Sequence, residues 1–214
     1  MHKRLLSVVF LTAALIAPLG AQPALQKPGS KSVTGITGGT YSVDPAHTLV
    51  SWTVDHFGFS PYTGIFGNVT GTLVLDPKNP AAARVDVSIP VAEVTTANKD
   101  LTGHLLRAAK EAGAKPDFFG PNPAPARFVS TGVKVLGNQR AMISGNLMLN
   151  GVTKPVVLAA SFYGAGKAPA MMGGAENVGF TARATIKRSD FGLTFIIPLV
   201  SDEVTLDIAA AFKK

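Results

Sequence analysis

The stretch that decides the fold is residues 41–66, YSVDPAHTLVSWTVDHFGFSPYTGIF. It contains Trp52, the only tryptophan of the chain, and two of the four histidines. From Val50 onward apolar side chains alternate with polar ones, and His56 ends the apolar series. A period of two is typical of a strand with one buried face. A strand that carries Trp52 inward and ends at an imidazole on the same face indicates either the wall of a lined cavity or a packed core.

The same alternation recurs along the chain and predicts eight or nine short strands, connected mostly by short links and therefore antiparallel. The expected strands cover residues 41–44, 47–56, 63–75, 85–91, 127–136, 141–149, 152–163, 177–187 and 203–212. One segment, 97–112, has apolar residues at helical spacing after a good N-cap, Asn98, and predicts a helix that ends at Gly113. The pattern therefore predicts an all-β domain, either a closed barrel or a sandwich, with one inserted helix.

The first 21 residues have the pattern of a secretory signal: basic residues, an apolar run from Leu5 to Leu19, then small residues before a cut after Ala21. An uncleaved anchor is the alternative. We therefore expect a signal peptide over 1–21, a flexible linker rich in Pro, Gly, Ser and Thr over 22–39, and a barrel domain over 40–214. Export to the periplasm or secretion follows from the signal, and the chain has no cysteine for disulfides.

The charge of the chain is mildly basic. It has 20 Lys and Arg against 13 Asp and Glu, and the predicted signal removes Lys3 and Arg4. The basic residues are scattered, whereas nucleic-acid binding needs a clustered footprint, so we expect no nucleic-acid partner. A transient contact with a membrane surface stays open.

Few residues could support catalysis or metal binding. Beyond the signal the histidines are His47, His56 and His104. His47 and His56 are separated by an odd number of positions and so point to opposite faces of a strand, which argues against a metal site. No Gly-x-Ser-x-Gly elbow and no phosphate-binding glycine loop occur. We expect no enzyme and no cofactor; the alternative is an enzyme for a lipid-like or small substrate with one of these histidines as general base.

Three blocks of the sequence, in order, resemble the YceI family of lipocalin-like periplasmic proteins that bind polyisoprenoid chains. The first block comprises Tyr41, Asp44, Pro45, His47, Trp52, His56, Phe59, Ser60, Gly64, Phe66 and Gly71. The later blocks are Leu149, Gly151, Val152, Thr153, Lys154 and Pro155, and then Arg188, Ser189, Asp190, Phe191 and Gly192. The resemblance implies an eight-stranded antiparallel lipocalin-like barrel rather than a sandwich. It also implies a polyisoprenoid ligand, either an isoprenoid quinone or a polyprenyl chain, held in an apolar cavity. A homodimer stays open.

The candidate ligand-binding residues are mostly aromatic and lie on predicted inward faces, at strand ends or in loops. They are Trp52, Val54, His56, Phe59, Phe66, Phe118, Phe119, Phe128, Phe162, Phe180 and Phe191. For Phe162 and Phe180 we favour simple core packing. Phe118 and Phe119 are adjacent in a Pro-rich loop, where both cannot fit a strand pattern, so we expect them to form a lid over the mouth of the barrel.

Three short motifs have structural interpretations. Asn150-Gly151 between two apolar runs predicts a type I′ hairpin. Residues 188–190 predict a turn in which Asp190 caps its own backbone. Asp44 and His47 are expected to hydrogen-bond across the first turn.

Overall fold

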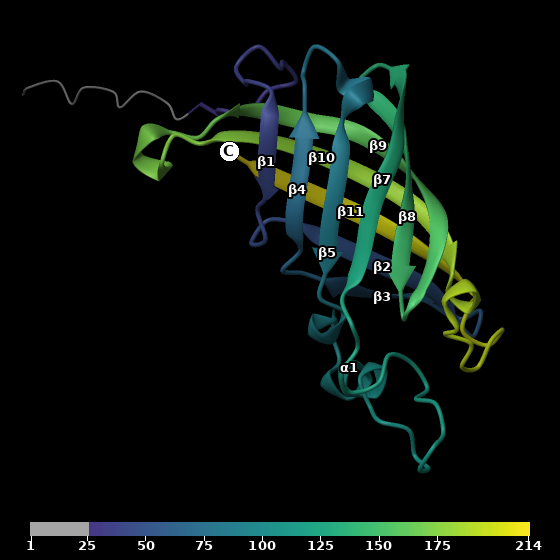
Figure 1. The fold of residues 1–214 in the computed structure, drawn as a ribbon. Helices are drawn as coiled ribbons and strands as arrows, with labels where there is room; N and C mark the ends of the chain where they lie inside the picture. Colours follow the sequence, from purple (N-terminus) through teal and green to yellow (C-terminus); the bar gives the residue numbers. More distant parts are fainter. Residues whose placement is uncertain (1–25) are drawn as a thin grey trace, which may run out of the picture.

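The computed structural model describes residues 26–214, so the predicted signal peptide over 1–21 lies outside the described residues. The described chain forms one antiparallel sheet that closes on itself, with a short helix beneath it (Figure 1). The strands are β1 (Gly39–Val43), β2 (Leu49–His56), β3 (Ser60–Phe66), β4 (Thr70–Leu75), β5 (Arg84–Ile89), β6 (Thr95–Thr96), β7 (Ala126–Gly137), β8 (Arg140–Leu149), β9 (Val152–Lys167), β10 (Glu176–Lys187) and β11 (Glu203–Lys213). The helix is α1 (Lys99–Leu105), and four short 3-10 turns are η1 (Pro80–Ala82), η2 (Val91–Glu93), η3 (Ala170–Met172) and η4 (Arg188–Phe191).

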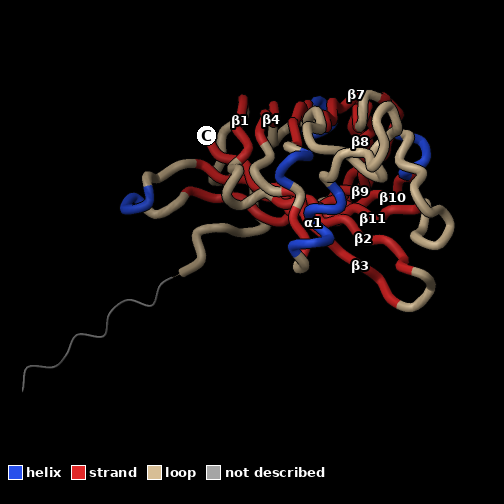
Figure 2. Tube along the Cα trace, turned by 90° about the horizontal axis from the view of Figure 1, so that it is seen from below, coloured by secondary structure: helices blue, strands red, loops and turns tan. Residues whose placement is uncertain are grey.

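Pairing of β1 with β11 closes a ring of eight strands. The order around the ring is β1-β4-β5-β7-β8-β9-β10-β11. Past β1, the chain bends into β2, which pairs with β11 further along, and β3 and β6 extend the sheet beyond it. These pairings confirm the predicted eight-stranded antiparallel barrel with one inserted helix and exclude the sandwich. Seen from below, α1 lies across the end of the barrel (Figure 2).

Alternation places the apolar face of each strand inside the barrel, as on β10. Val178 and Ala184 are buried there, whereas Thr181 and Arg183 between them are exposed. The β8–β9 hairpin confirms the predicted type I′ turn. Leu149 pairs with Val152, and Asn150 and Gly151 both have positive φ angles, of 50° and 76°.

The strand predicted over 63–75 is in fact two strands. β3 ends at Phe66 and β4 begins at Thr70. Between them Asn68 adopts a left-handed conformation, with φ of 50°, which interrupts the extended backbone. The break lets the chain pair with β2 below and with β1 above.

The helix predicted over 97–112 is shorter than the spacing suggested. Asn98 is the N-cap, as predicted, and its side chain accepts a hydrogen bond from the Leu101 N–H at 3.0 Å. The helix ends at Leu105, whose carbonyl accepts a hydrogen bond from the Phe119 N–H at 3.0 Å. Arg107 and Ala108 beyond it are exposed. Short helices depend on such packing, so the helix stops where its buried face ends.

The stretch predicted as a flexible linker, 22–39, packs onto the barrel in its described part. Ser30 forms an antiparallel bridge with Ala165 of β9. Ile36 is 8% exposed and belongs to the upper core. The Pro, Gly and Ser content indicated flexibility, but the edge of β9, which continues to Lys167 rather than ending at Tyr163, supplies backbone partners for this segment.

A network around Tyr41 fixes the end of this segment. The Tyr41 hydroxyl donates to the Thr37 carbonyl and to Glu176 Oε2, and Glu176 also accepts from the Thr37 N–H at 2.8 Å. Burial, together with the Glu176 carboxylate, raises the pKa of Tyr41 to about 12. The hydroxyl therefore stays protonated and keeps donating at ordinary pH.

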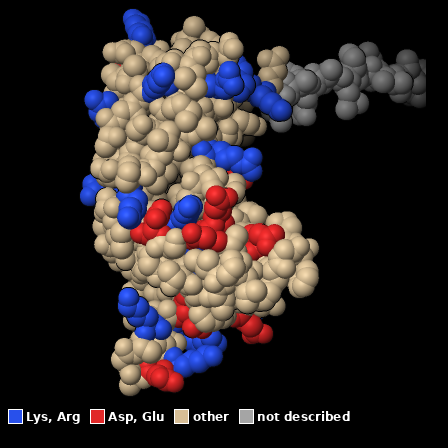
Figure 3. Space-filling view, turned by 90° about the vertical axis from the view of Figure 1, so that its right-hand side faces the viewer, with Lys and Arg blue, Asp and Glu red and all other residues tan. Residues whose placement is uncertain are grey.

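The surface carries charges of both signs. Figure 3 shows basic and acidic side chains interspersed on one face, without a continuous basic stripe. None of the helices within residues 26–214 is long and apolar enough to cross a membrane.

Candidate ligand-binding cavity

The barrel encloses a cavity of about 700 Å³. This volume lies within the usual range for small-molecule sites, roughly 300–1,000 Å³. Each strand of the ring contributes an inward side chain, for example Val43, Leu73, Val85, Phe128, Leu147, Leu158, Phe180 and Leu206. The cavity is therefore a product of the period-two pattern, whose apolar positions face a space rather than a solid core.

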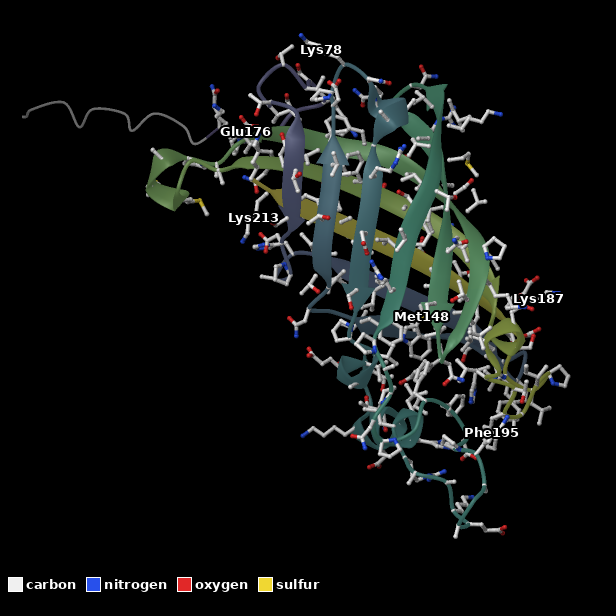
Figure 4. The ribbon with its side chains drawn as sticks, in the orientation of Figure 1. Lys78, Met148, Glu176, Lys187, Phe195 and Lys213 are labelled. Carbon is white, nitrogen blue, oxygen red and sulfur yellow. The ribbon has the colours of Figure 1, made fainter. Side chains whose placement is uncertain are left out.

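The cavity runs from one end of the barrel to the other. Pro77, the chain neighbour of Lys78, lines it at the upper end, and Phe195 lines it at the α1 end, where it contacts His104 (Figure 4). The long axis suits an extended chain better than a compact molecule.

Nine of the eleven candidate ligand-binding residues line this cavity. They are Trp52, Val54, His56, Phe66, Phe118, Phe119, Phe128, Phe162 and Phe180. Phe162 and Phe180, for which we favoured core packing, contact each other edge to face at 5.8 Å and also face the cavity.

Two of the predicted residues, Phe59 and Phe191, lie outside the cavity lining. Phe59 is in the β2–β3 turn, where the alternation has ended, and its side chain is 88% exposed. Phe191 is in η4 and is 1% exposed; it packs in the lower core with Val91 and does not line the cavity. Neither residue sits on a strand, so the inward or outward rule does not apply to them.

The inward face of β2 follows the predicted order, with Val50, Trp52, Val54 and His56 all on the cavity wall. The Trp52 indole lies over Gly64, its partner on β3, where a side chain would overlap the ring. Tyr62, two residues earlier on β3, has its ring 6.4 Å from the Trp52 ring. Tyr62 was not among the predicted ligand-binding residues, although its even spacing from Phe66 places both on one face of the strand.

Residues of α1 and the following loop line the lower end of the cavity. His104, which the helical spacing from Leu101 and Leu105 places on the inner side, lies between Phe118 and Phe195 with edge-to-face contacts of 5.3 and 5.8 Å. Phe118 and Phe195 contact each other at 5.4 Å. The three rings therefore form one aromatic cluster at this end.

Asp117 anchors His104 in that cluster. His104 Nε2 lies 2.7 Å from Asp117 Oδ2, and the Arg107 guanidinium donates to the same oxygen at 2.9 Å. The hydrogen bond with His104, and then that with Arg107, hold the pKa of Asp117 below its usual range. The contact between Asp117 and His104 therefore joins the Pro-rich loop to α1.

Phe119 contacts Phe66 edge to face at 6.2 Å, so Phe118 and Phe119 both reach the cavity from the loop. Their place at the α1 end is where a lid would lie. That they form a lid over the mouth of the barrel stays a prediction.

The connection from 188 to 202 forms the neighbouring part of this end, and a buried arginine organises it. Arg188 is 5% exposed, and its guanidinium donates hydrogen bonds of 2.7–2.9 Å to four backbone carbonyls. The acceptors belong to Leu193, Phe195, Val200 and Ser201. Burial lowers the pKa of Arg188. The guanidinium thus holds in place a loop whose side chains line the cavity.

The predicted turn at 188–190 is present, but its cap is not Asp190. The Asp202 carboxylate accepts from the Ser189 N–H at 2.8 Å and from its hydroxyl at 2.7 Å, while Asp190 is exposed. The sequence could not reveal this because Asp202 reaches the turn only after the chain folds back. The predicted bond between Asp44 and His47 is present, at 2.9 Å.

The three histidines do not come together. His47 is exposed beside Asp44, His56 lies on the cavity wall at the end of β2, and His104 is held by Asp117. Within residues 26–214 no group of three or more His, Cys, Asp or Glu side chains could hold a metal ion.

Comparison with known proteins identifies the family to which this architecture belongs. The model of the YceI-like domain matches residues 41–212. A UPF0312 protein of Shewanella baltica is 32% identical over 97% of this chain and 96% of its own length. Among solved structures, a Campylobacter jejuni YceI protein is similar with a TM-score of 0.59 at 27% identity, over 75% of this chain and 89% of that one. A polyisoprenoid binding domain from Saccharophagus degradans shares the fold, with a TM-score of 0.53 at 14% identity, over 81% of this chain and 97% of that domain. With its barrel, its cavity and a family match over most of its length, the chain belongs to the YceI-like family.

Proposed function

We propose that this protein binds a polyisoprenoid lipid, an isoprenoid quinone or a polyprenyl chain, in the barrel cavity and acts as a carrier rather than as an enzyme. The observation that carries the proposal is the elongated cavity of about 700 Å³ with an almost wholly apolar wall. Family membership supports it, and so does the fold shared with a domain described as polyisoprenoid-binding.

The apolar wall of the cavity favours binding of a hydrocarbon chain. Each methylene removed from water contributes about 0.8 kcal/mol, so a chain of several isoprene units needs few polar contacts to bind. The aliphatic side chains Val43, Leu73 and Leu206 offer such a surface, and the aromatic cluster at α1 covers one end. The proposal requires no cofactor in addition to this ligand.

The N-terminal sequence supports a periplasmic or secreted location for the carrier, since residues 1–21 have the pattern of an export signal. A carrier of this kind must meet a membrane to load or deliver a lipid. We include that contact in the proposal.

An exposed apolar ridge beside the cavity is the surface we assign to this contact. Phe57 and Phe59 project from the β2–β3 turn with stacked rings 6.5 Å apart, and Ile196 and Leu199 are exposed on the adjacent connection. The Phe57 N–H donates to the Leu199 carbonyl at 2.7 Å, which joins the two loops. No Asp, Glu, Lys or Arg occurs in 56–75 or 191–201, so the ridge suits an apolar partner. Ile196 of the ridge and the adjacent Phe195 also line the cavity, so the ridge borders its lower end.

The test of the proposal is a fluorescence titration with a long-chain isoprenoid quinone. Trp52 is the only tryptophan and lies on the cavity wall, so an entering chain should change its emission saturably. Ala182→Phe should abolish the change because Ala182 faces the cavity between Ala160 and Ile208. Thr181→Phe, on the outer face of the same strand, is the matched control and should bind normally.

Two results would count against the carrier proposal. One is an emission that does not respond to added isoprenoid while the protein is folded and free of other lipid. The other is equal binding by Ala182→Phe and Thr181→Phe, because it would place the ligand outside the barrel.

A further inference from the structure

The segment before β1 lies outside the family match and yet packs against the barrel. The model of the YceI-like domain matches residues 41–212, whereas the chain already contacts β9 at Pro28. We call residues 28–37 the strap. In Figure 1 it belongs to the purple trace that loops above β1. The strap is therefore an addition to the barrel that the family shares, and its contacts indicate its role.

The first part of the strap is held along β9. Ser30 and Ala165 exchange two backbone hydrogen bonds, of 3.0 and 2.8 Å. The positions on either side of Ala165 are both glycine. A Cβ atom added at Gly166 would lie 2.2 Å from the Pro28 carbonyl oxygen, and one added at Gly164 would lie 3.1 Å from that of Ser30. A side chain at 166 would push the strap away, so the absence of one there allows this close contact.

The last part of the strap is held where β10 begins. Glu176 Oε2 accepts hydrogen bonds from the Thr37 N–H at 2.8 Å and from its hydroxyl at 3.1 Å. The Lys214 ammonium donates to the same hydroxyl at 2.9 Å. Between the two ends, the Gln139 side chain in the β7–β8 turn donates to the Lys31 carbonyl at 2.8 Å. The strap is thus supported at both ends and from the side.

The strap also supplies part of the cavity wall. Lys31 and Val33 both line the cavity. The Lys31 ammonium donates to the Phe162 carbonyl at 2.8 Å, so Val33 is left as the apolar side chain that the strap presents to a ligand. Gly38, directly after the strap, lies beside Pro77, which lines the upper end of the cavity. Val33 therefore belongs to that end.

The upper core fills the barrel next to the strap. Ile36 of the strap belongs to the same buried cluster as Leu73 of β4 and Ala165 of β9. β4 and β9 lie on opposite sides of the ring of eight strands. Side chains from both sides therefore meet at this level around a residue of the strap, which narrows the barrel there.

From these contacts we infer that the strap closes the upper end of the cavity and sets the longest isoprenoid chain that the cavity can hold. Each carbon atom buried against the apolar wall adds affinity until the end of the chain reaches Val33. A longer chain must then fold back, displace the strap or leave its other end in water. This limit rests on the proposed function and adds the residue that determines which chain lengths are bound.

A series of linear isoprenoid alcohols, from farnesol to solanesol, tests the limit with Trp52 emission as the readout. The affinity of the wild-type protein should rise with chain length and fall once the chain outgrows the cavity. Val33→Phe should move this maximum to a shorter chain. The alcohol that the wild type binds best should lose about tenfold in affinity, as when roughly two carbon atoms can no longer be buried, while farnesol binds as before. Thr34→Phe is the matched control, because Thr34 does not line the cavity, and it should keep the wild-type maximum.

A second pair of variants displaces the strap without changing its sequence. Gly166→Val places a side chain where the Pro28 carbonyl lies, so chains longer than the wild-type maximum should no longer lose affinity. Gly132→Val on β7 is the control, because a Cβ atom there meets open space, and it should keep the maximum. Melting temperatures establish that each variant is folded. If Val33→Phe does not fold, the comparison of Gly166→Val with Gly132→Val decides.

Three results would overturn the limit while the carrier proposal stands. The first is a wild-type affinity without a maximum across the series. The second is a Val33→Phe variant that weakens short and long alcohols equally or leaves the maximum in place. The third is a Gly166→Val variant that keeps the same maximum as Gly132→Val. If the wild-type protein binds none of the alcohols, the carrier proposal itself fails, and the limit fails with it.

Discussion

Replacing Arg188 with methionine should destabilise the protein far more than replacing an exposed arginine of the neighbouring strand β10. The guanidinium donates to four backbone carbonyls in the 188–202 connection. Methionine fills much of the same volume but offers no donor. The variant therefore tests what hydrogen bonding by a single buried side chain contributes to this end of the barrel.

The magnitude follows from the burial of the acceptors. The bonds to Leu193 and Val200 are buried, and a buried carbonyl left without a partner costs about 1–3 kcal/mol. The bonds to Phe195 and Ser201 are partly exposed, so water can replace the guanidinium there. Two buried carbonyls thus give a loss of about 2–6 kcal/mol, or at least about 4 °C in melting temperature for a chain of this size.

The assay is urea unfolding followed by far-ultraviolet circular dichroism. Arg183→Met is the matched control, because Arg183 lies on β10 and its ion pair with Asp207 is exposed on both sides. Exposed pairs contribute little, so the control should lose less than about 1 kcal/mol. A loss in Arg188→Met no larger than that of the control would refute the reasoning.

Two further predictions concern acid stability and membrane contact. His104 and Arg107 depress the pKa of Asp117, so its contribution to stability is complete above about pH 4, the usual unfolded value, and is lost as the pH falls through the depressed folded value. The urea midpoint of the wild type should therefore fall more steeply below about pH 4 than that of Asp117→Asn, and equal slopes would contradict the assignment. Phe59→Ser should weaken sedimentation with phosphatidylcholine vesicles about tenfold, as for one exposed aromatic ring leaving the lipid surface. Tyr163→Ser, which removes an exposed ring elsewhere on the barrel, should bind vesicles normally, and parallel losses in both variants would argue against the ridge.

Residue alternation predicted the barrel strands well because burial follows a simple period along them. The inward series from Val50 to His56 lines the cavity as predicted, and the ends of β8 and β11 lie within one residue of the predicted ends. Turn chemistry was equally local, so Asn150-Gly151 could be recognised without knowledge of the fold. The choice of a barrel over a sandwich, however, depended on the family resemblance.

Features that depend on contacts between distant residues were missed or misplaced. Helical spacing carried the predicted helix past Leu105, although Arg107 and Ala108 just beyond it are exposed. The segment before β1 was expected to be flexible, yet Ser30 and Ile36 find partners on the barrel. Asp202 caps a turn 13 residues earlier in the chain, which no local pattern could indicate.

The site was predictable in kind but incomplete in detail. Strand positions identified Trp52 and Val54 because their direction follows from the alternation, whereas Phe59 in a turn has no such rule. Tyr62 was not predicted, although it shares the inward face of β3 with Phe66. Its unpaired hydroxyl becomes visible only when the neighbouring strands are in place.

The central claim is that the cavity holds an isoprenoid lipid, and organic extraction of the purified protein followed by mass spectrometry tests it most directly. The protein should come from its native host and be purified without detergent, so that any bound lipid is retained. We predict recovery of an isoprenoid quinone or polyprenyl lipid from the wild-type protein and its loss from Ala182→Phe. Recovery of no lipid, together with no uptake of added isoprenoid quinone by the folded protein, would contradict the account.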